Sequence, residues 1–191
     1  MKLSFSQLSG SLSSRRFFLK ASVAGVCSLF CRPAFAALFL AELPEGRLSL
    51  YNVHTNEKLG VTYRDSTGVY DEGALKEMDH FLRCHYTGES IKMDIAAIEF
   101  LNLVGKKLAG NREIRIISGY RSPEYNRLLR VEGRGVVKNS LHLQGKAIDF
   151  NIPCVNLENV RQIALSLRLG GVGYYPKSDF VHVDSGRFRY W

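Results

Sequence analysis

Alternation of apolar and polar residues predicts several short strands along the chain. Residues 47–64 alternate on both sides of the turn-forming stretch HTNEK, a pattern typical of a β-hairpin. Further short apolar runs bounded by turn-forming residues predict four more strands. These strands are expected at residues 113–120, 146–152, 170–175 and 179–184.

Apolar residues at helical spacing predict helices between these strands. The clearest lies at residues 94–110, where Asp94 is placed to cap the first turn. Ser122 followed by Pro123 is typical of the first turn of another helix. Two further helices are expected at residues 71–84 and 157–169. Because helices and strands do not alternate as regular βαβ units, the pattern predicts an α+β fold.

The first 36 residues have the organisation of an export signal. The segment SRRFFLK, residues 14–20, places two arginines before an apolar run and resembles a twin-arginine signal. That run is too short to span a bilayer, so no permanent membrane anchor is expected. Ala34 and Ala36 are small enough for the pockets of a signal peptidase, which predicts cleavage near Ala36 and Ala37.

Two other interpretations of this segment stay open. A Sec-type signal could carry the arginine pair by chance. Cys27 and Cys31 invite a lipoprotein interpretation, but the residues before them lack the leucine and small side chains of such a signal. We expect a twin-arginine signal at residues 1–36, a linker at 37–46, one domain at 47–191, and export to the periplasm by the twin-arginine translocase.

The positive charge of the chain belongs mostly to this signal. The formal net charge is +8, but five of the 26 basic residues and none of the 18 acidic residues lie in residues 1–36. The rest of the chain therefore carries a net charge of +3, with no dense basic stripe. Nucleic acid is not an expected partner, whereas a mildly positive face would favour an anionic cell-wall polymer.

Two predicted strands place polar side chains on one face. Because side chains alternate along a strand, Asp149 points away from the apolar residues of the strand at 146–152. His182 likewise points away from the apolar residues of the strand at 179–184. If these strands are neighbours, the two polar residues share a face. His142, in the turn before the first strand, can then close over the same point.

Two imidazoles and a carboxylate around a cleft suit a catalytic zinc ion. Such an ion commonly takes three protein ligands and leaves a fourth position for water, whose pKa it lowers. An ordinary hydrogen-bonded histidine and aspartate at a loop edge would give the same spacing. The remaining histidines lack this context and are expected to be surface or hydrogen-bonded residues; they are His54, His80 and His85.

The spacing of the first two candidate ligands is part of a longer motif. Residues 140–149, SLHLQGKAID, match the signature S-x-H-x-x-G-x-A-x-D of the D-alanyl-D-alanine carboxypeptidases and dipeptidases. That group shares a zinc fold with lysostaphin-type peptidases and the hedgehog signalling domain. With the export signal and the C-terminal segment FVHVDSGRFRYW, the chain resembles the murein endopeptidase K family over about residues 45–191. The resemblance implies a small antiparallel sheet with helices packed on one face.

The resemblance also implies roles for individual residues. It implies one zinc ion per chain, with three ligands: His142, Asp149 and His182. Asp179, three residues before the last ligand, would act as general base and then as general acid. Arg121, in the segment SGYRS, would bind the substrate carbonyl and its developing negative charge. A salt bridge at a helix start is the structural alternative for this arginine.

Three further residues complete the predicted site. Ser140 and Gly145 are expected to shape the turn that carries His142, with the glycine giving the backbone room to turn. Asp184 lies on the same strand face as His182. It would serve either as a partner of that ligand or as a substitute base.

The second motif departs from the family pattern. The group more often has Glu-x-x-His with a tryptophan before the histidine, whereas this chain has Asp179 and, before the histidine, Val181. An aspartate is one methylene shorter than a glutamate. The base must therefore lie closer to the water or act through a relay.

The resemblance implies a periplasmic zinc peptidase that cuts peptidoglycan cross-links. The bonds would be those to meso-diaminopimelate, of the D-alanine or L-diaminopimelate type. One alternative is a carboxypeptidase that removes terminal D-alanine and needs a closed pocket. Another is a zinc-bearing wall-binding module without catalysis, which would need neither Asp179 nor Arg121.

Two other features leave questions open. The loop VEGRGVVKN, residues 131–139, could border a substrate groove and offer Arg134 and Lys138 to peptide carboxylates. Outside the signal only two cysteines remain, Cys84 and Cys154. They could pair in an oxidising compartment or simply pack as small buried side chains.

Overall fold

The computed structural model describes residues 45–108 and 112–191. The predicted signal at residues 1–36 and residues 37–44 of the predicted linker lie outside these ranges. The first strand begins at Gly46, the last residue of that linker. Within the described ranges, no helix has the length and apolar character needed to cross a membrane.

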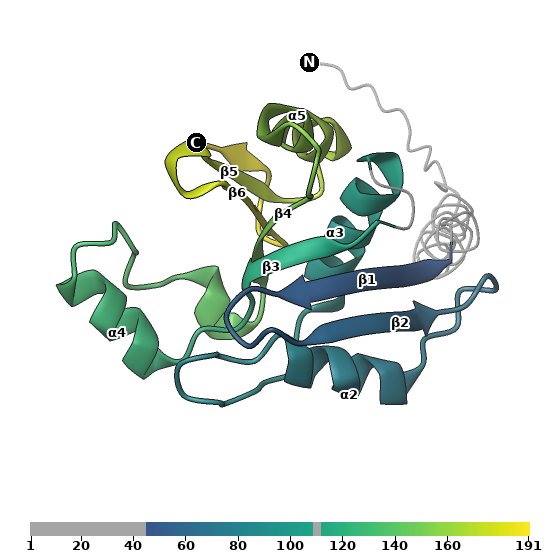
Figure 1. Cartoon of the computed structure of the whole chain (residues 1–191), viewed down its shortest axis with the longest axis horizontal. Coiled ribbons are helices and arrows are strands. Elements are labelled where there is room, and N and C mark those ends of the chain that lie inside the picture. Colours follow the sequence, from purple (N-terminus) through teal and green to yellow (C-terminus); the bar gives the residue numbers. More distant parts are fainter. Residues whose placement is uncertain (1–44, 109–111) are drawn as a thin grey trace, which may run out of the picture. The chain divides into compact units, whose positions relative to one another are not determined.

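A seven-stranded sheet forms the centre of the domain, in the order β2-β1-β3-β4-β6-β5-β7 (Figure 1). Its strands are β1 Gly46–Asn52, β2 Lys58–Arg64, β3 Ile114–Ser118, β4 Ala147–Asn151, β5 Gly171–Tyr175, β6 Phe180–Asp184 and β7 Arg189–Tyr190. Most neighbours are antiparallel, but β1 pairs with β3, and β5 with β7, in parallel. The α+β class is confirmed, with a sheet that is mixed rather than wholly antiparallel.

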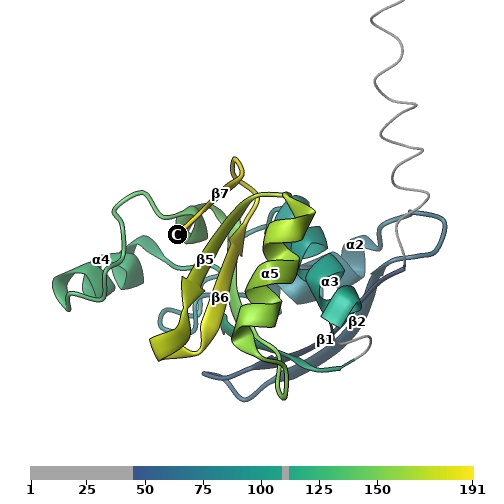
Figure 2. The ribbon, with the colours of Figure 1, turned by 90° about the horizontal axis from the view of Figure 1, so that it is seen from above.

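The helices lie between these strands in the chain. They are α2 Glu72–Phe81, α3 Ile95–Leu108, α4 Pro123–Val131 and α5 Leu157–Leu167, with short 3-10 turns η1 Leu141–Gln144 and η2 Pro176–Ser178. Helices α3 and α5 pack on each other and on the sheet, and cover one of its faces, while α2 packs against β2 (Figure 2). Helix α4 projects from one end of the sheet in both views.

The core fixes which face of the sheet is polar. Ile148 and Phe150 of β4, and Val181 and Val183 of β6, are fully buried in the hydrophobic core. Burial of each such side chain contributes about 1.5–3 kcal/mol. A slip of one residue would move the whole set to the other face. The register of these two strands is therefore strongly specified.

Strand β7 and turn η1 were not predicted as regular elements. The two residues of β7 carry no periodic signal, and their pairing with Gly171 and Val172 is a tertiary contact. Turn η1 begins after Ser140, whose hydroxyl accepts a hydrogen bond from the backbone N–H of His142. It ends at Gly145, which adopts the left-handed conformation with φ of 65°. The glycine therefore turns the chain as expected.

Replacement of Gly145 by alanine should lower the free energy of unfolding by more than the cost of backbone strain alone. A left-handed L-residue costs about 1–2 kcal/mol. A Cβ at residue 145 would also lie 2.9 Å from the carbonyl oxygen of Lys92. Gly88→Ala is the matched control, because Gly88 has φ of 75° but open space around its Cβ position. Chemical denaturation should give a lower free energy of unfolding for Gly145→Ala than for Gly88→Ala. Equal decreases in the two variants would contradict the packing argument.

Candidate metal centre

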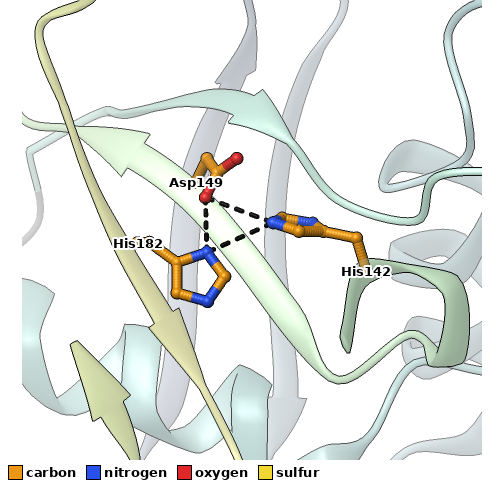
Figure 3. A group of neighbouring side chains, drawn as sticks. All are labelled: His142, Asp149 and His182. Atoms are coloured by element: carbon orange, nitrogen blue, oxygen red, sulfur yellow. Dashed lines mark hydrogen bonds and ion pairs between the residues drawn. The ribbon is translucent and has the colours of Figure 1, made fainter. Parts of the chain in front are cut away.

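Three buried polar side chains from three different elements meet on the polar face of the sheet (Figure 3). His142 comes from η1, Asp149 from β4 and His182 from β6. Asp149 and His182 are directly opposite each other in the β4–β6 pair. The two strands are thus adjacent, as the sequence predicts, and η1 lies over the face that they share.

The ligand atoms form a compact triangle. The His142 Nε2 atom lies 3.2 Å from Asp149 Oδ1 and 3.2 Å from His182 Nδ1. The Asp149 Oδ1 atom lies 2.7 Å from His182 Nδ1. Tetrahedral coordination with bonds of about 2.0–2.1 Å places ligand atoms roughly 3.3 Å apart. The two imidazoles and the carboxylate therefore fit a divalent metal ion of this size and geometry.

The second nitrogen of each imidazole is held by an acceptor. His142 Nδ1 lies 2.7 Å from the carbonyl oxygen of Gly119, and His182 Nε2 lies 3.0 Å from Asp184 Oδ2. A carbonyl oxygen and a carboxylate oxygen accept hydrogen bonds, so the proton sits on the imidazole nitrogen in both cases. His142 Nε2 and His182 Nδ1 are left to face Asp149. Such outer partners orient the ligands of a metal site.

Asp184 is fixed by several donors besides His182. Its side chain is fully buried and forms a paired contact with the guanidinium of Arg189, at 2.9 and 2.7 Å. The backbone N–H groups of Gly171 and Gly186 also donate to it. Burial alone would raise the pKa of this carboxyl, but His182 and Arg189 hold it well below its usual value. Of its two predicted roles, the structure gives Asp184 that of a partner of His182.

In the metal-free centre His182 is protonated. Burial lowers the pKa of this imidazole, but hydrogen bonds to Asp149 and Asp184 outweigh burial and raise the pKa to about 9. Burial lowers the pKa of His142 more than Asp149 raises it. Burial raises the pKa of Asp149, yet the two histidines hold it below its ordinary value. His182 is therefore cationic at neutral pH, between two carboxylates.

Arg121 lies against the same centre. It precedes Ser122, the N-cap of α4, and its Nη2 atom lies 3.5 Å from Asp149 Oδ2 and 3.4 Å from Ser118 Oγ. Its backbone N–H donates to the carbonyl oxygen of His142. Its Nε atom is buried and has no hydrogen-bond partner. The arginine predicted from the segment SGYRS thus stands beside a candidate ligand with one donor uncommitted.

Asp179 lies further along the polar face. It is exposed, follows η2, and has φ of 53°. Its carboxylate accepts a hydrogen bond of 2.9 Å from the side chain of Asn151. Asn151 is two residues after Asp149 on β4, so the two side chains point to the same side of the strand. The structure therefore joins Asp179 to β4 through Asn151, outside the three-residue cluster.

The remaining histidines and cysteines lie apart from the cluster. His54 stacks on His85 with ring centroids 3.8 Å apart, and His85 makes a T-shaped contact with Tyr125. Burial, helped by the charges of His54 and Arg121, lowers the pKa of His85 to about 4. Among the described residues, Cys84 is buried, Cys154 is exposed, and neither forms a disulfide.

The loop at 131–139 is exposed over nearly its whole length. Asn126 anchors its far end by donating to the carbonyl oxygens of Val137 and Lys138. Arg134 pairs at 3.4 Å with the exposed Glu132. The loop is therefore held to α4.

Comparison with known proteins agrees with this geometry. The family model described as "Peptidoglycan L,D-endopeptidase MepK" matches residues 43–191. The chain belongs to this family. A MepK relative from Escherichia coli K12 is 38% identical over 178 residues, which cover 93% of this chain and 96% of the relative. A "probable" MepK from Haemophilus influenzae is 41% identical over 158 residues, which cover 82% and 84%. No solved structure matches the chain.

Membership of the MepK family confirms two predictions made from the sequence. The resemblance inferred from the motif at residues 140–149 is correct, and the chain is an enzyme of the peptidase class. The family is one of metal-dependent peptidases, and the cluster of His142, Asp149 and His182 supplies a site that could hold the ion. Sequence reasoning missed Gly119, Arg189 and Trp191, which contact the two histidine ligands directly or through Asp184.

Binding of a divalent metal should release about one proton per chain at pH 7. The proton comes from His182, whose pKa is about 9 in the metal-free centre. Below that pH the apparent affinity should rise about tenfold per pH unit, because the metal competes with this proton. Calorimetric titration with zinc in buffers of different ionisation enthalpy measures the number released.

Asp184→Asn is the control variant for this titration. It removes one of the two carboxylates that raise the pKa of His182, so fewer protons should be released at the same pH. Equal proton release by both proteins would contradict the assignment of the proton to His182.

Proposed function

We propose that the chain is a zinc-dependent endopeptidase of peptidoglycan that hydrolyses L,D amide bonds in peptide cross-links. The observation that carries the proposal is the buried triangle of His142, Asp149 and His182 in a chain of the MepK family. The relatives from Escherichia coli and Haemophilus influenzae carry the name of this activity, with "probable" in the second case.

The name of these relatives also favours one of the two bond types that the sequence left open. A bond from D-alanine to diaminopimelate joins two D centres. A bond between two diaminopimelates joins a carbonyl on an L centre to an amine on a D centre. The L,D activity of the relatives therefore supports the second bond as the substrate of this chain.

Zinc is the metal that the ligand set favours. Two imidazoles and one carboxylate form a common three-ligand set for catalytic zinc, which keeps a fourth position open. When bound, the ion would polarise the scissile carbonyl and lower the pKa of water. The outer hydrogen bonds to Gly119 and Asp184 support a centre whose ligands are oriented before the ion arrives.

Arg121 is proposed to stabilise the negative charge that develops on the carbonyl oxygen. It is always cationic and lies at the Asp149 side of the centre. Its backbone N–H donates to the carbonyl oxygen of His142, which holds the arginine against the turn that carries a candidate ligand. A preorganised donor of this kind contributes about 2.7–4 kcal/mol to the transition state.

Asp179 is proposed to take the proton of the attacking water and return it to the leaving amine. Its carboxylate is exposed and, within residues 45–108 and 112–191, accepts a hydrogen bond from the side chain of Asn151. Asp184, the other candidate, is fully buried and already accepts from His182 and Arg189. An accessible carboxylate suits proton transfer better than one that is fully engaged.

The enzyme is further proposed to act in the periplasm after export. Its substrate lies outside the cytoplasm, and residues 14–20 resemble a twin-arginine signal at the start of the predicted segment 1–36. A twin-arginine route would carry the domain, residues 47–191, in its folded state. Replacement of Arg15 and Arg16 by lysine should retain the protein in the cytoplasm; unchanged export would favour a Sec-type signal.

Digestion of purified sacculi by residues 37–191 tests the reaction. With zinc, mass spectrometry should show loss of dimers joined between two diaminopimelates, and a chelator should prevent that loss. Release of single alanines without loss of dimers would instead indicate a carboxypeptidase. Binding to sacculi without any product would indicate a wall-binding module.

Substitution of Asp179 tests the general base. Asp179→Asn should lower kcat by about 10²–10⁴ without loss of zinc, because it removes the proton acceptor alone. Asp179→Glu, the residue more common in the wider group, should keep much of the activity. Lys177→Ala is the control, because Lys177 is an exposed residue of the same turn. Full activity of Asp179→Asn would show that this carboxylate is not the base.

A further inference from the structure

An aromatic wall, Trp191 and Tyr175, stands beside the metal centre. The ring centroid of Trp191 lies 5.4 Å from that of His182. The indole Nε1–H donates a hydrogen bond of 2.7 Å to the Tyr175 hydroxyl. Tyr175 in turn stacks on Phe180 at 4.6 Å. Both residues of the wall keep a large exposed fraction, 47% for Trp191 and 37% for Tyr175.

The indole lies directly on the sheet. A Cβ at Gly173 would come within 2.8 Å of Trp191 Cε2 and 2.9 Å of its Cζ2. Gly173 is opposite His182 in the β5–β6 pair. The missing side chain of this glycine therefore makes the space in which the ring rests beside the ligand.

The backbone of the last residue is also fixed. The Trp191 N–H donates to the carbonyl oxygen of Val172, and its carbonyl oxygen accepts from the Tyr174 N–H. The guanidinium of Arg189 lies 5.0 Å from the indole centroid and also pairs with Asp184. One set of contacts thus holds both the indole and the outer partner of His182. An aromatic ring that is rigid and yet half exposed beside a reaction centre is suited to bind substrate.

We propose that the wall of Trp191 and Tyr175 binds the methylene stem of the diamino acid that flanks the scissile bond, and so selects diaminopimelate cross-links. The inference rests on the proposed function. In an L,D cross-link both residues at the bond are diaminopimelates, so a methylene stem adjoins the metal centre whichever side of the bond the wall faces.

The short distance from His182 to Trp191 favours the stem over other parts of peptidoglycan. The glycan is joined to the cross-link through several residues, each of which spans up to about 3.3–3.6 Å. The stem, in contrast, belongs to the residue at the scissile bond itself and needs no intervening residue to reach a ring beside a metal ligand. A carboxylate is also a poor occupant, because the nearby cation of Arg189 is already paired with Asp184.

The expected effect is a dependence on the length of the stem. Each methylene buried against the wall should improve kcat/KM about fourfold. The wild-type enzyme should therefore cleave a soluble dimer of diaminopimelate about fourfold better than one built from diaminoadipate, whose stem is shorter by a single methylene. Without the indole, the two dimers should be cleaved at similar rates.

The experiment compares three variants on these two dimers, with bound zinc and thermal stability measured for each. Trp191→Ala removes the ring, and Gly173→Ala displaces it by adding a Cβ in its place. Tyr190→Ala is the matched control, because Tyr190 is an exposed neighbour that forms no part of the wall. The first two variants should lose the preference, mainly through KM for the diaminopimelate dimer. The control should keep it.

Fluorescence supplies a second readout. Trp191 is the single tryptophan of the sequence, so the emission of the Asp179→Asn protein should change when the diaminopimelate dimer binds, and change less with the shorter dimer. A preference retained in both Trp191→Ala and Gly173→Ala, or an emission that does not respond, would overturn the inference and leave the proposed function intact. A wild-type enzyme that cleaves neither dimer would overturn both.

Discussion

The candidate site depends on the register between β4 and β6. Their apolar residues are buried against α3 and α5, and this burial fixes which side chains point the other way. Asp149 then stands directly opposite His182. No local interaction between the two polar residues is needed to bring them together, because burial of the apolar residues determines the register. A slip of the register by one residue would turn the apolar side chains to the polar face and the polar side chains into the core. Both the core and the site would then be lost.

Residues around the candidate ligands fix the orientation of their side chains. The carbonyl of Gly119 and the carboxylate of Asp184 each hold one imidazole by its distal nitrogen. Arg189 keeps Asp184 in place and also approaches Trp191. The C-terminal residues are thus tied both to the metal centre and to the aromatic wall beside it. Strand β7 has only two residues, yet this arrangement lets it position side chains of a site that lies on other strands.

Much of the site could be predicted from the sequence, because its signals are local. The period of two in the strands gives the face of Asp149 and His182, and the motif at residues 140–149 gives His142 and the turn at Gly145. The outer contacts could not be predicted in the same way. Gly119 contributes only a backbone carbonyl, and Arg189 and Trp191 reach the centre through tertiary pairing of β7 with β5. The parallel pairing of β1 with β3 likewise joins segments that are far apart in the chain, and no local pattern predicts it.

The most direct test is a zinc titration of the metal-free domain while cleavage of a purified dimer joined between two diaminopimelates is followed. If His142, Asp149 and His182 form the catalytic metal site, activity should rise linearly and reach its plateau at one zinc per chain. Asp149→Asn should show no such rise at the same zinc concentrations. Activity without added metal in a protein shown to be metal-free, or an undiminished response from Asp149→Asn, would contradict the central claim.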